Sequence, residues 1–292
     1  MSKFTIKDLE NLSGIKAHTI RIWEQRYSFL KPNRTDTNIR YYSNDDLKTI
    51  LNISILNKYG FKISHINKMS VTDVQARVAE LNIGGAQQER IVNDLIQMMV
   101  DLDMAGFEKI LEKQIVANGI EKTIIKIIFP FFERIGILWQ TGHINPAQEH
   151  LTTNIIRQKL IVGIDHAKPL FKINKSFLLF LPEKELHELG LLLVYYLLKK
   201  RGANVFYIGA NVPLTDAQFV AEAKKPDYIY IHLTSSSPGF NFSKFLSQVT
   251  EKIPRSKIII SGYPTLSYKR ALPKNVEFKH SLIELVEFIS SL

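Results

Sequence analysis

The chain has 292 residues, 45% of them hydrophobic, with 38 basic and 28 acidic residues. This length is about twice that of a typical domain, so at least two compact units are expected. The absence of cysteine excludes disulfides and thiolate zinc sites, so any metal must be held by histidine, carboxylate or a cofactor. No apolar run is long enough to cross a bilayer, and the N-terminus lacks the pattern of a signal peptide. These features predict a cytoplasmic protein with no membrane partner.

The excess positive charge is concentrated near the N-terminus. Residues 1–70 contain 12 Lys and Arg against 6 Asp and Glu, which gives +6 of the chain's total of +10. Positive charge localised on one module is the electrostatic footprint of nucleic-acid binding.

Residues 5–60 show the pattern of a winged helix-turn-helix. A capping-box pair, Thr5 and Asp8, opens a short amphipathic helix that a turn at Ser13-Gly14 separates from a second helix over 16–26. The stretch "LKPNRTDTNIRYYS" predicts a β-hairpin wing, and "SNDD" opens a further helix that ends near Gly60.

The second helix and the wing supply the candidate DNA contacts. Ile20 and Trp23 are expected to face the core, while polar residues of the same helix can face a groove. Arginines on such modules usually contact phosphates, although each basic residue here has the alternative of being a solvated surface charge. The candidate DNA-binding residues are Lys16, His18, Thr19, Arg21, Arg34, Arg40 and Tyr41.

These spaced elements resemble the MerR family of transcription regulators. The resemblance rests on the capped first helix, "TIRIWEQRY", Pro-x-Arg, Arg-Tyr-Tyr and Ser-x-x-Asp-Leu, in family order across residues 4–70. It implies a DNA-binding domain at residues 1–72 whose partner is double-stranded promoter DNA. Thr37-Asn38 stands in the wing where relatives often have glycines, so the shape of this loop is less defined.

Residues 73–168 are helical by periodicity, and four antiparallel helices with short connections predict a bundle. Pro130 is expected to kink one helix, and Asn145 with Pro146 has the residue types that cap and begin another. The short "QTGHI" connection brings Trp139 and the pair Glu149-His150 to the same end of the bundle. Taken alone, this Glu-His pair is an ordinary first-turn pair that complements the helix dipole.

Residues 174–292 alternate between apolar strands and amphipathic helices. This alternation predicts a doubly wound, Rossmann-like parallel sheet with helices on both faces. Ligands of such sheets bind at the carboxyl ends of the strands. His187, Asn211, Thr234–Ser237 and Ser261-Gly262 all fall at these ends.

His187 is the candidate metal ligand. Glu185 is placed to accept the Nδ1 proton, which leaves Nε2 to face a metal, and Gly190 permits a close approach to the backbone. A histidine at a strand end is more often a hydrogen-bonded core residue, but three polar elements in order on one sheet edge favour a cofactor site.

The order of these elements resembles that of cobalamin-binding domains. The elements are Glu185-x-His187-x-x-Gly190, then Thr234-Ser235-Ser236, then Ser261-Gly262. The resemblance implies that His187 is the lower ligand of cobalt and that the nucleotide tail of cobalamin passes Thr234 and lies beside Ser261-Gly262. Thr234-x-Ser236 replaces the usual Ser-x-Leu, and Ser261 replaces a glycine. Both changes can narrow or reshape the space for the tail.

The three parts together resemble light-sensing regulators of the CarH/LitR type. In that resemblance Trp139 covers the upper face of adenosylcobalamin, and Glu149 and His150 line the adenosyl pocket. The implied protein is a repressor and not an enzyme. It binds promoter DNA in the dark as a homo-oligomer, a tetramer or dimer, and releases the DNA when light breaks the cobalt–carbon bond. Gln140 stands where some members have a second cobalt-binding histidine, so ligation by His187 alone is expected.

Two other functions are compatible with parts of the sequence. A MerR-type regulator whose C-terminal domain works without cobalamin, or senses another ligand, would explain the replacements at Thr234 and Ser261. A corrinoid enzyme is disfavoured because the chain carries a DNA-binding head and no substrate module.

Overall fold

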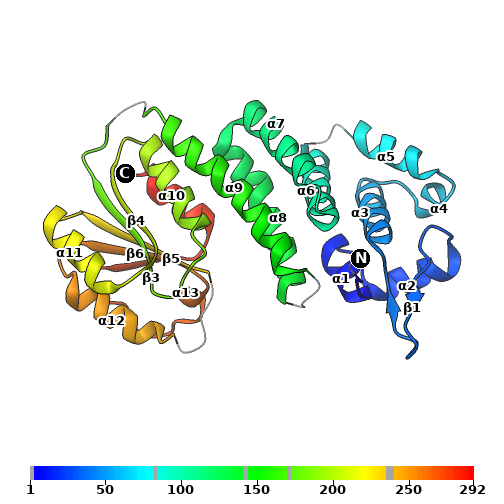
Figure 1. Cartoon of the computed structure of the whole chain (residues 1–292). Coiled ribbons are helices and arrows are strands. Elements are labelled where there is room, and N and C mark those ends of the chain that lie inside the picture. The colour runs from blue at the N-terminus through cyan, green and yellow to red at the C-terminus, as the bar shows by residue number, and fades with distance from the viewer. Residues whose placement is uncertain (1–2, 82–83, 141–143, 170–171, 235–239) are drawn as a thin grey trace. The chain divides into compact units, whose positions relative to one another are not determined.

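The computed structural model describes residues 3–81, 84–140, 144–169, 172–234 and 240–292, with the side chains of 84 and 137–140 outside the description. The chain forms two compact units, residues 1–155 and 156–292. The division falls within helix α9 (Pro146–His166), which is drawn in green in Figure 1. Each unit is described below by itself.

The first unit begins with a helix-turn-helix. Helix α1 (Ile6–Ser13) opens with the predicted capping box, in which the Thr5 hydroxyl accepts from the Asp8 backbone N–H and the Asp8 carboxylate accepts from the Thr5 backbone N–H. Gly14 ends this helix in the left-handed conformation, with φ of 74°, which glycine adopts without steric cost. Helix α2 (Ala17–Arg26) follows at once, and its Ile20 and Trp23 are buried as predicted.

The predicted wing is a two-stranded antiparallel ribbon of β1 (Asn33–Arg34) and β2 (Arg40–Tyr41). Its turn contains Asn38 with φ of 65°, and asparagine tolerates this left-handed conformation better than most residues. Helix α3 (Asn44–Lys58) then starts at a second capping box, between Ser43 and Asp46.

The rest of the first unit is helical. The elements are α4 (Ile63–Ile66), α5 (Val71–Glu80), α6 (Gly84–Asp101), α7 (Met104–Thr123), the π-helical turn η1 (Ile124–Ile128), α8 (Phe129–Gln140) and α9. Gly119 interrupts α7 with non-helical backbone angles. Pro130 lies in the first turn of α8, where a missing backbone N–H costs no hydrogen bond within the helix. The predicted kink at Pro130 stays a prediction.

Polar contacts join α3, which follows the helix-turn-helix and the wing, to these helices. The Asn93 side chain on α6 donates to the Leu51 carbonyl oxygen on α3 at 3.3 Å and accepts from Arg134 on α8. Lys48 on α3 pairs with Asp101 at the end of α6 at 2.6 Å. The first unit therefore contains both the helix-turn-helix and much of the helical region, while the division at residues 1–72, 73–168 and 174–292 stays a prediction.

The second unit contains the predicted five-stranded parallel sheet, with strand order β4-β3-β5-β6-β7. Its strands are β3 (Ser176–Pro182), β4 (Asn204–Val212), β5 (Tyr228–Leu233), β6 (Lys257–Gly262) and β7 (Val276–Lys279). Its helices are α10 (Leu189–Lys200), α11 (Leu214–Lys224), α12 (Phe242–Lys252), α13 (Tyr263–Ser267) and α14 (Leu282–Ser290).

The two faces of the sheet carry different side chains. Ile229, Ile231 and Leu233 of β5 pack in a core with residues of α11 and α12, the yellow and orange helices of Figure 1. Because side chains alternate along a strand, Tyr230 and His232 lie on the other face, where the His232 ring meets α10 at Gly190. No helix within the described ranges is both long and apolar enough to span a membrane.

Gly262→Ala is expected to destabilise the second unit by at least about 2 kcal/mol. Gly262 has φ of 105°, and an added Cβ would collide with the carbonyl oxygen of Leu233 on the neighbouring strand. Gly136→Ala on α8 is the control, because nothing lies within 4 Å of its added Cβ. Urea denaturation of the two variants measures the difference, and equal midpoints would contradict the assigned strain.

Candidate cofactor site and nucleic-acid interface

His187 lies in the loop between β3 and α10, two residues before the helix begins at Leu189. The sequence pattern predicted that the helix starts at His187 itself, so the observed helix starts two residues later than expected. Strand β3 ends at Pro182 and is an interior strand of the sheet, between β4 and β5. The loop therefore stands at the carboxyl edge of a doubly wound sheet, where the topology leaves a crevice for ligands.

The Glu185 carboxylate fixes the orientation of His187. His187 Nδ1 lies 2.7 Å from Glu185 Oε1, and the His187 backbone N–H donates to the same oxygen at 3.0 Å. The carboxylate is buried while the imidazole is 51% exposed. A proton held on Nδ1 by the carboxylate leaves the lone pair on Nε2, the form in which neutral histidine binds a metal. The pair therefore fits the lower-ligand role expected from the sequence.

Thr234 at the end of β5 completes the hydrogen bonds of Glu185. The Thr234 backbone N–H donates to Glu185 Oε2 at 3.1 Å, and its hydroxyl lies 3.2 Å from both carboxylate oxygens. Burial opposes ionisation of this carboxyl group, but the hydrogen bonds from His187 and Thr234 outweigh burial and lower the pKa of Glu185 to about 2. Glu185 is therefore a permanent carboxylate at neutral pH.

Gly190 is in contact with the side chain of His232. A Cβ atom on Gly190 would lie 2.6 Å from His232 Nε2 and closer still to Cδ2. His232 belongs to β5 and was not among the candidate residues from the sequence. The close approach that Gly190 permits is therefore made by this protein's own imidazole ring.

Ser261 lies between two larger polar side chains. Its hydroxyl oxygen is 2.6 Å from the Tyr230 hydroxyl and 2.8 Å from His232 Nδ1. Desolvation, opposed by the charge of Glu185, lowers the pKa of His232 to about 4. Desolvation also raises the pKa of Tyr230, so both groups are neutral at physiological pH.

Apolar side chains are exposed at the same edge of the sheet. Leu186, adjacent to His187, is 67% exposed, and Tyr263 and Leu266 of α13 are also exposed. Exposed apolar groups at the carboxyl edge of a parallel sheet are typical of a ligand-binding surface.

The carboxylate of Glu188, next to His187, joins three elements. Arg157 on α9 pairs with Glu188 at 2.5 Å, and the Tyr207 hydroxyl on β4 donates to Glu188 at 2.8 Å. Desolvation and this carboxylate raise the pKa of Tyr207. The loop of His187 is therefore anchored on both sides, by Glu185 to β5 and by Glu188 to α9 and β4. In the sequence, the only indication of this anchor was that a charged residue, Glu188, follows His187.

The remaining candidate cofactor residues are described less fully. Trp139 lies in α8, but its side chain is outside the described atoms, and Ser236 lies outside the described residues. Glu149 and His150 lie in the first turns of α9, where His150 Nδ1 is 3.3 Å from the Glu149 carboxylate. Asn145 accepts from the Ala147 backbone N–H, which is the expected cap of this helix.

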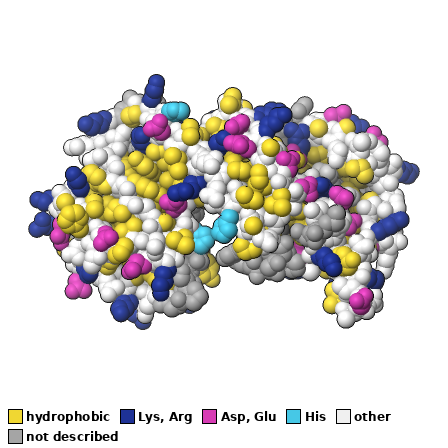
Figure 2. Space-filling model, in the orientation of Figure 1, with side chains coloured by type: hydrophobic (Ala, Val, Ile, Leu, Met, Phe, Trp, Pro, Cys, Tyr) yellow, Lys and Arg dark blue, Asp and Glu magenta, His cyan; other side chains and the backbone are white. Residues whose placement is uncertain are grey.

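The candidate DNA-binding residues lie on α2, at its start and in the wing. Lys16, His18 and Arg21 are exposed, and Thr19 is partly exposed. In the wing, Arg34 donates to the Asn38 side chain at 2.7 Å, which orders the turn. Figure 2 shows that basic side chains on the drawn face of this unit stand among acidic ones and form no single patch.

Glu24 connects α2 to the wing, a role that no pattern in the sequence indicated. Arg40 Nε donates to the Glu24 carboxylate at 3.1 Å, and the hydroxyl of the buried Tyr42 donates to its other oxygen. This hydrogen bond uses Nε, the guanidinium nitrogen bonded to the aliphatic part of the Arg40 side chain. The bond therefore orients the Arg40 side chain alongside α2 and connects the helix to the wing.

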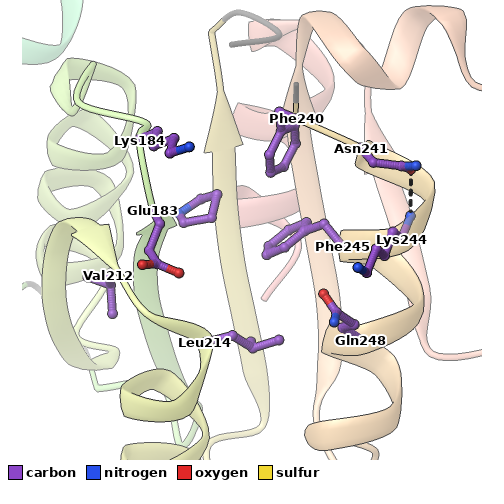
Figure 3. A pocket seen from close by; sticks show the side chains of 10 residues that line it. Glu183, Lys184, Val212, Leu214, Phe240, Asn241, Lys244, Phe245 and Gln248 are labelled. Carbon is purple, nitrogen blue, oxygen red and sulfur yellow. Dashed lines mark hydrogen bonds between the residues drawn. The ribbon is translucent and has the colours of Figure 1, made fainter. Parts of the chain in front are cut away.

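A separate shallow hollow of about 310 Å³ lies beside the β3 loop on the α11 and α12 side (Figure 3). Phe240 and Phe245 line it from one side and Leu214 from the other, with Glu183 and Lys244 among its polar residues. Val212 and Phe245 belong to the core on that face of the sheet. The hollow is therefore on the opposite face from Tyr230 and His232.

Comparison with known proteins agrees with this architecture. Residues 4–70 match the MerR helix-turn-helix regulatory family, and residues 91–162 match a B12-binding domain family. The transcriptional repressors CarH and CarA of Myxococcus xanthus are 28% and 22% identical, over 86% and 96% of this chain and 86% and 94% of their own lengths. The monomethylamine corrinoid protein of Methanosarcina barkeri shares the fold with a TM-score of 0.57 and 15% identity, over 70% of this chain and all of that one.

The fold and these matches define a transcription regulator in which a helix-turn-helix domain is followed by a helical region that matches a B12-binding family and by a parallel α/β sheet. Within that class, the chain is a MerR-type regulator with a B12-binding domain, homologous to CarH and CarA.

The unfolding free energy is expected to fall by about 2 kcal/mol between pH 7 and pH 5 through His232 alone. The unfolded chain takes up a proton near pH 6.5, whereas native His232 resists protonation until about pH 4. Stability is thus lost as pH falls through this window, while the contribution of Glu185 is lost only below about pH 4.5. His232→Asn should flatten the pH dependence in urea titrations. An unchanged slope in His232→Asn would contradict the assignment.

Arg34→Ala and Arg40→Ala are each expected to lower the salt dependence of DNA affinity by about one unit of slope. Each removes one predicted phosphate contact. His18→Ala, on the exposed face of α2, should leave the slope unchanged and alter sequence preference instead. Fluorescence anisotropy over a salt series measures both effects, and an unchanged slope in both arginine variants would remove these residues from the interface.

Proposed function

We propose that the protein is an adenosylcobalamin-dependent, light-responsive transcriptional repressor that acts in the cytoplasm. It binds promoter DNA as a homo-oligomer in the dark and releases the DNA on illumination. The observation that carries this proposal is the ordered, half-exposed His187 beside a buried carboxylate at the carboxyl edge of the sheet. The match of residues 91–162 to a B12-binding family and the similarity to CarH and CarA support it.

Each of these residues would have its own role in binding the cofactor. His187 would hold the cobalt from below, and Glu185 would keep its proton on Nδ1. Leu186 and Gly190 would lie near the corrin ring, while Trp139, Glu149 and His150 would contribute to the adenosyl side. When bound, adenosylcobalamin supplies a light-sensitive cobalt–carbon bond. The chain's own task is to bind DNA differently with and without the intact cofactor, which requires the cofactor to favour the assembled state.

Assembly of several copies would strengthen DNA binding without new contacts on any single head. When DNA-binding domains are linked in an oligomer, binding of the first domain raises the effective concentration of the second at the DNA. Lys16, Thr19 and Arg21 on α2, with Arg34, Arg40 and Tyr41 in the wing, would be repeated on each copy. Loss of the oligomer would then release the DNA.

A gel-shift and size-exclusion series with adenosylcobalamin, in darkness and under green light, tests the proposal. The wild type should assemble and shift DNA only in the dark with cofactor. His187→Ala should lose at least about tenfold in cofactor affinity, whereas His166→Ala should behave as wild type.

DNA binding that ignores both cofactor and light would instead favour a MerR-type regulator that works without cobalamin or senses another ligand. The filled space around Ser261 is the observation that favours this second function.

A further inference from the structure

The face of the sheet that packs against α10, next to the His187 loop, is filled with this chain's own side chains. If cobalamin binds in the proposed way, its nucleotide tail needs room beside Ser261-Gly262. On β5 and β6, this face carries Tyr230, His232 and Ser261, and His232 is paired directly with Ser261 across the two strands. The question is whether these groups leave any room.

The side chains are closely packed and bonded to one another. Tyr230 is 2% exposed and Ser261 is 5% exposed. The Ser261 hydroxyl bridges the Tyr230 hydroxyl and His232 Nδ1 at 2.6 and 2.8 Å. Moving any member out of the way leaves the others with unsatisfied buried polar atoms, which costs about 1–3 kcal/mol for each group.

Helix α10 covers Tyr230, His232 and Ser261 on this face of the sheet. The backbone of Gly190 is so close to the His232 ring that even one added methyl group would overlap it. The next residues of α10, from Leu191 to Val194, are buried. A dimethylbenzimidazole group is larger than a methyl group by many atoms, so it does not fit between α10 and this part of the sheet.

We propose that Tyr230, His232 and Ser261 exclude the nucleotide tail from the sheet interior, so that the protein recognises a corrinoid through its ring and His187 alone. This inference rests on the proposed function and names the chemical class of its ligand. The tail would remain outside the sheet, and a corrinoid without a nucleotide would bind as well as cobalamin.

Absorbance titrations in the dark with adenosylcobalamin and adenosylcobinamide, which lacks the nucleotide, test this selectivity. For the full-length wild type, the two dissociation constants should agree within about threefold. Binding of adenosylcobalamin more than about tenfold tighter would overturn the proposal, because it would show that the tail has its own site.

A variant that opens the space provides the second measurement. His232→Ser should raise affinity for adenosylcobalamin at least about tenfold and leave that for adenosylcobinamide unchanged. Gln248→Ala, in the hollow on the opposite face, is the matched control and should change neither. Equal effects of His232→Ser on both ligands would overturn the proposal. If this variant does not fold, Ser261→Gly gives the same comparison.

Failure of the proposed function has a different signature. If the wild type binds neither corrinoid, the cofactor-dependent function and the recognition of the ring by His187 are both contradicted, and the variants then decide only whether the three side chains exclude the tail. Uptake of adenosylcobalamin by His232→Ser or Ser261→Gly supports exclusion of the tail. Absence of uptake in both folded variants overturns it.

Discussion

The second unit depends on one buried carboxylate, that of Glu185. It accepts hydrogen bonds from the backbone and ring of His187 and from the backbone and hydroxyl of Thr234. These bonds outweigh the cost of burying its charge and keep it ionised far below neutral pH. One side chain thus holds the loop after β3 against the end of β5, and it orients the imidazole that the proposed function requires.

The first unit uses a carboxylate in a similar way. Glu24 on α2 accepts from Arg40 and Tyr42 and so connects the helix to the wing. In both units a mostly buried acid accepts hydrogen bonds from separate elements. This sets the direction of a functional group, which is the half-exposed His187 ring in one unit and the partly exposed Arg40 guanidinium in the other. Preorganised groups of this kind lose less conformational entropy when a ligand binds.

The site and its surroundings differ in how well they suit cobalamin. The Glu185–His187 pair and the exposed apolar residues at the sheet edge suit a corrin ring with a cobalt ion. The interior beside Ser261 does not suit a nucleotide tail, because Tyr230 and His232 occupy it. A ligand site whose outer part is open and whose inner part is filled can keep a ring-binding function while losing selectivity for the tail.

The sequence by itself determined the order and type of the main elements, though not the short elements α4, α5, η1 and α13. Capping boxes at Thr5 and Ser43, the two-stranded wing and the continuous apolar strands are local patterns, and the structure confirmed them. The ordered motif around His187 predicted the proposed cofactor loop for the same reason, since its residues are close in the chain.

Only the tertiary structure decided which distant side chains meet. Glu24 with Arg40, Arg157 with Glu188, and His232 with Gly190 and Ser261 are separated by 16 to 42 positions or come from different strands and helices. Periodic patterns along the sequence do not predict such pairs. Strand register and helix packing place His232 beside Ser261, and this contact, not the motif, determines how much of the cofactor the sheet can admit.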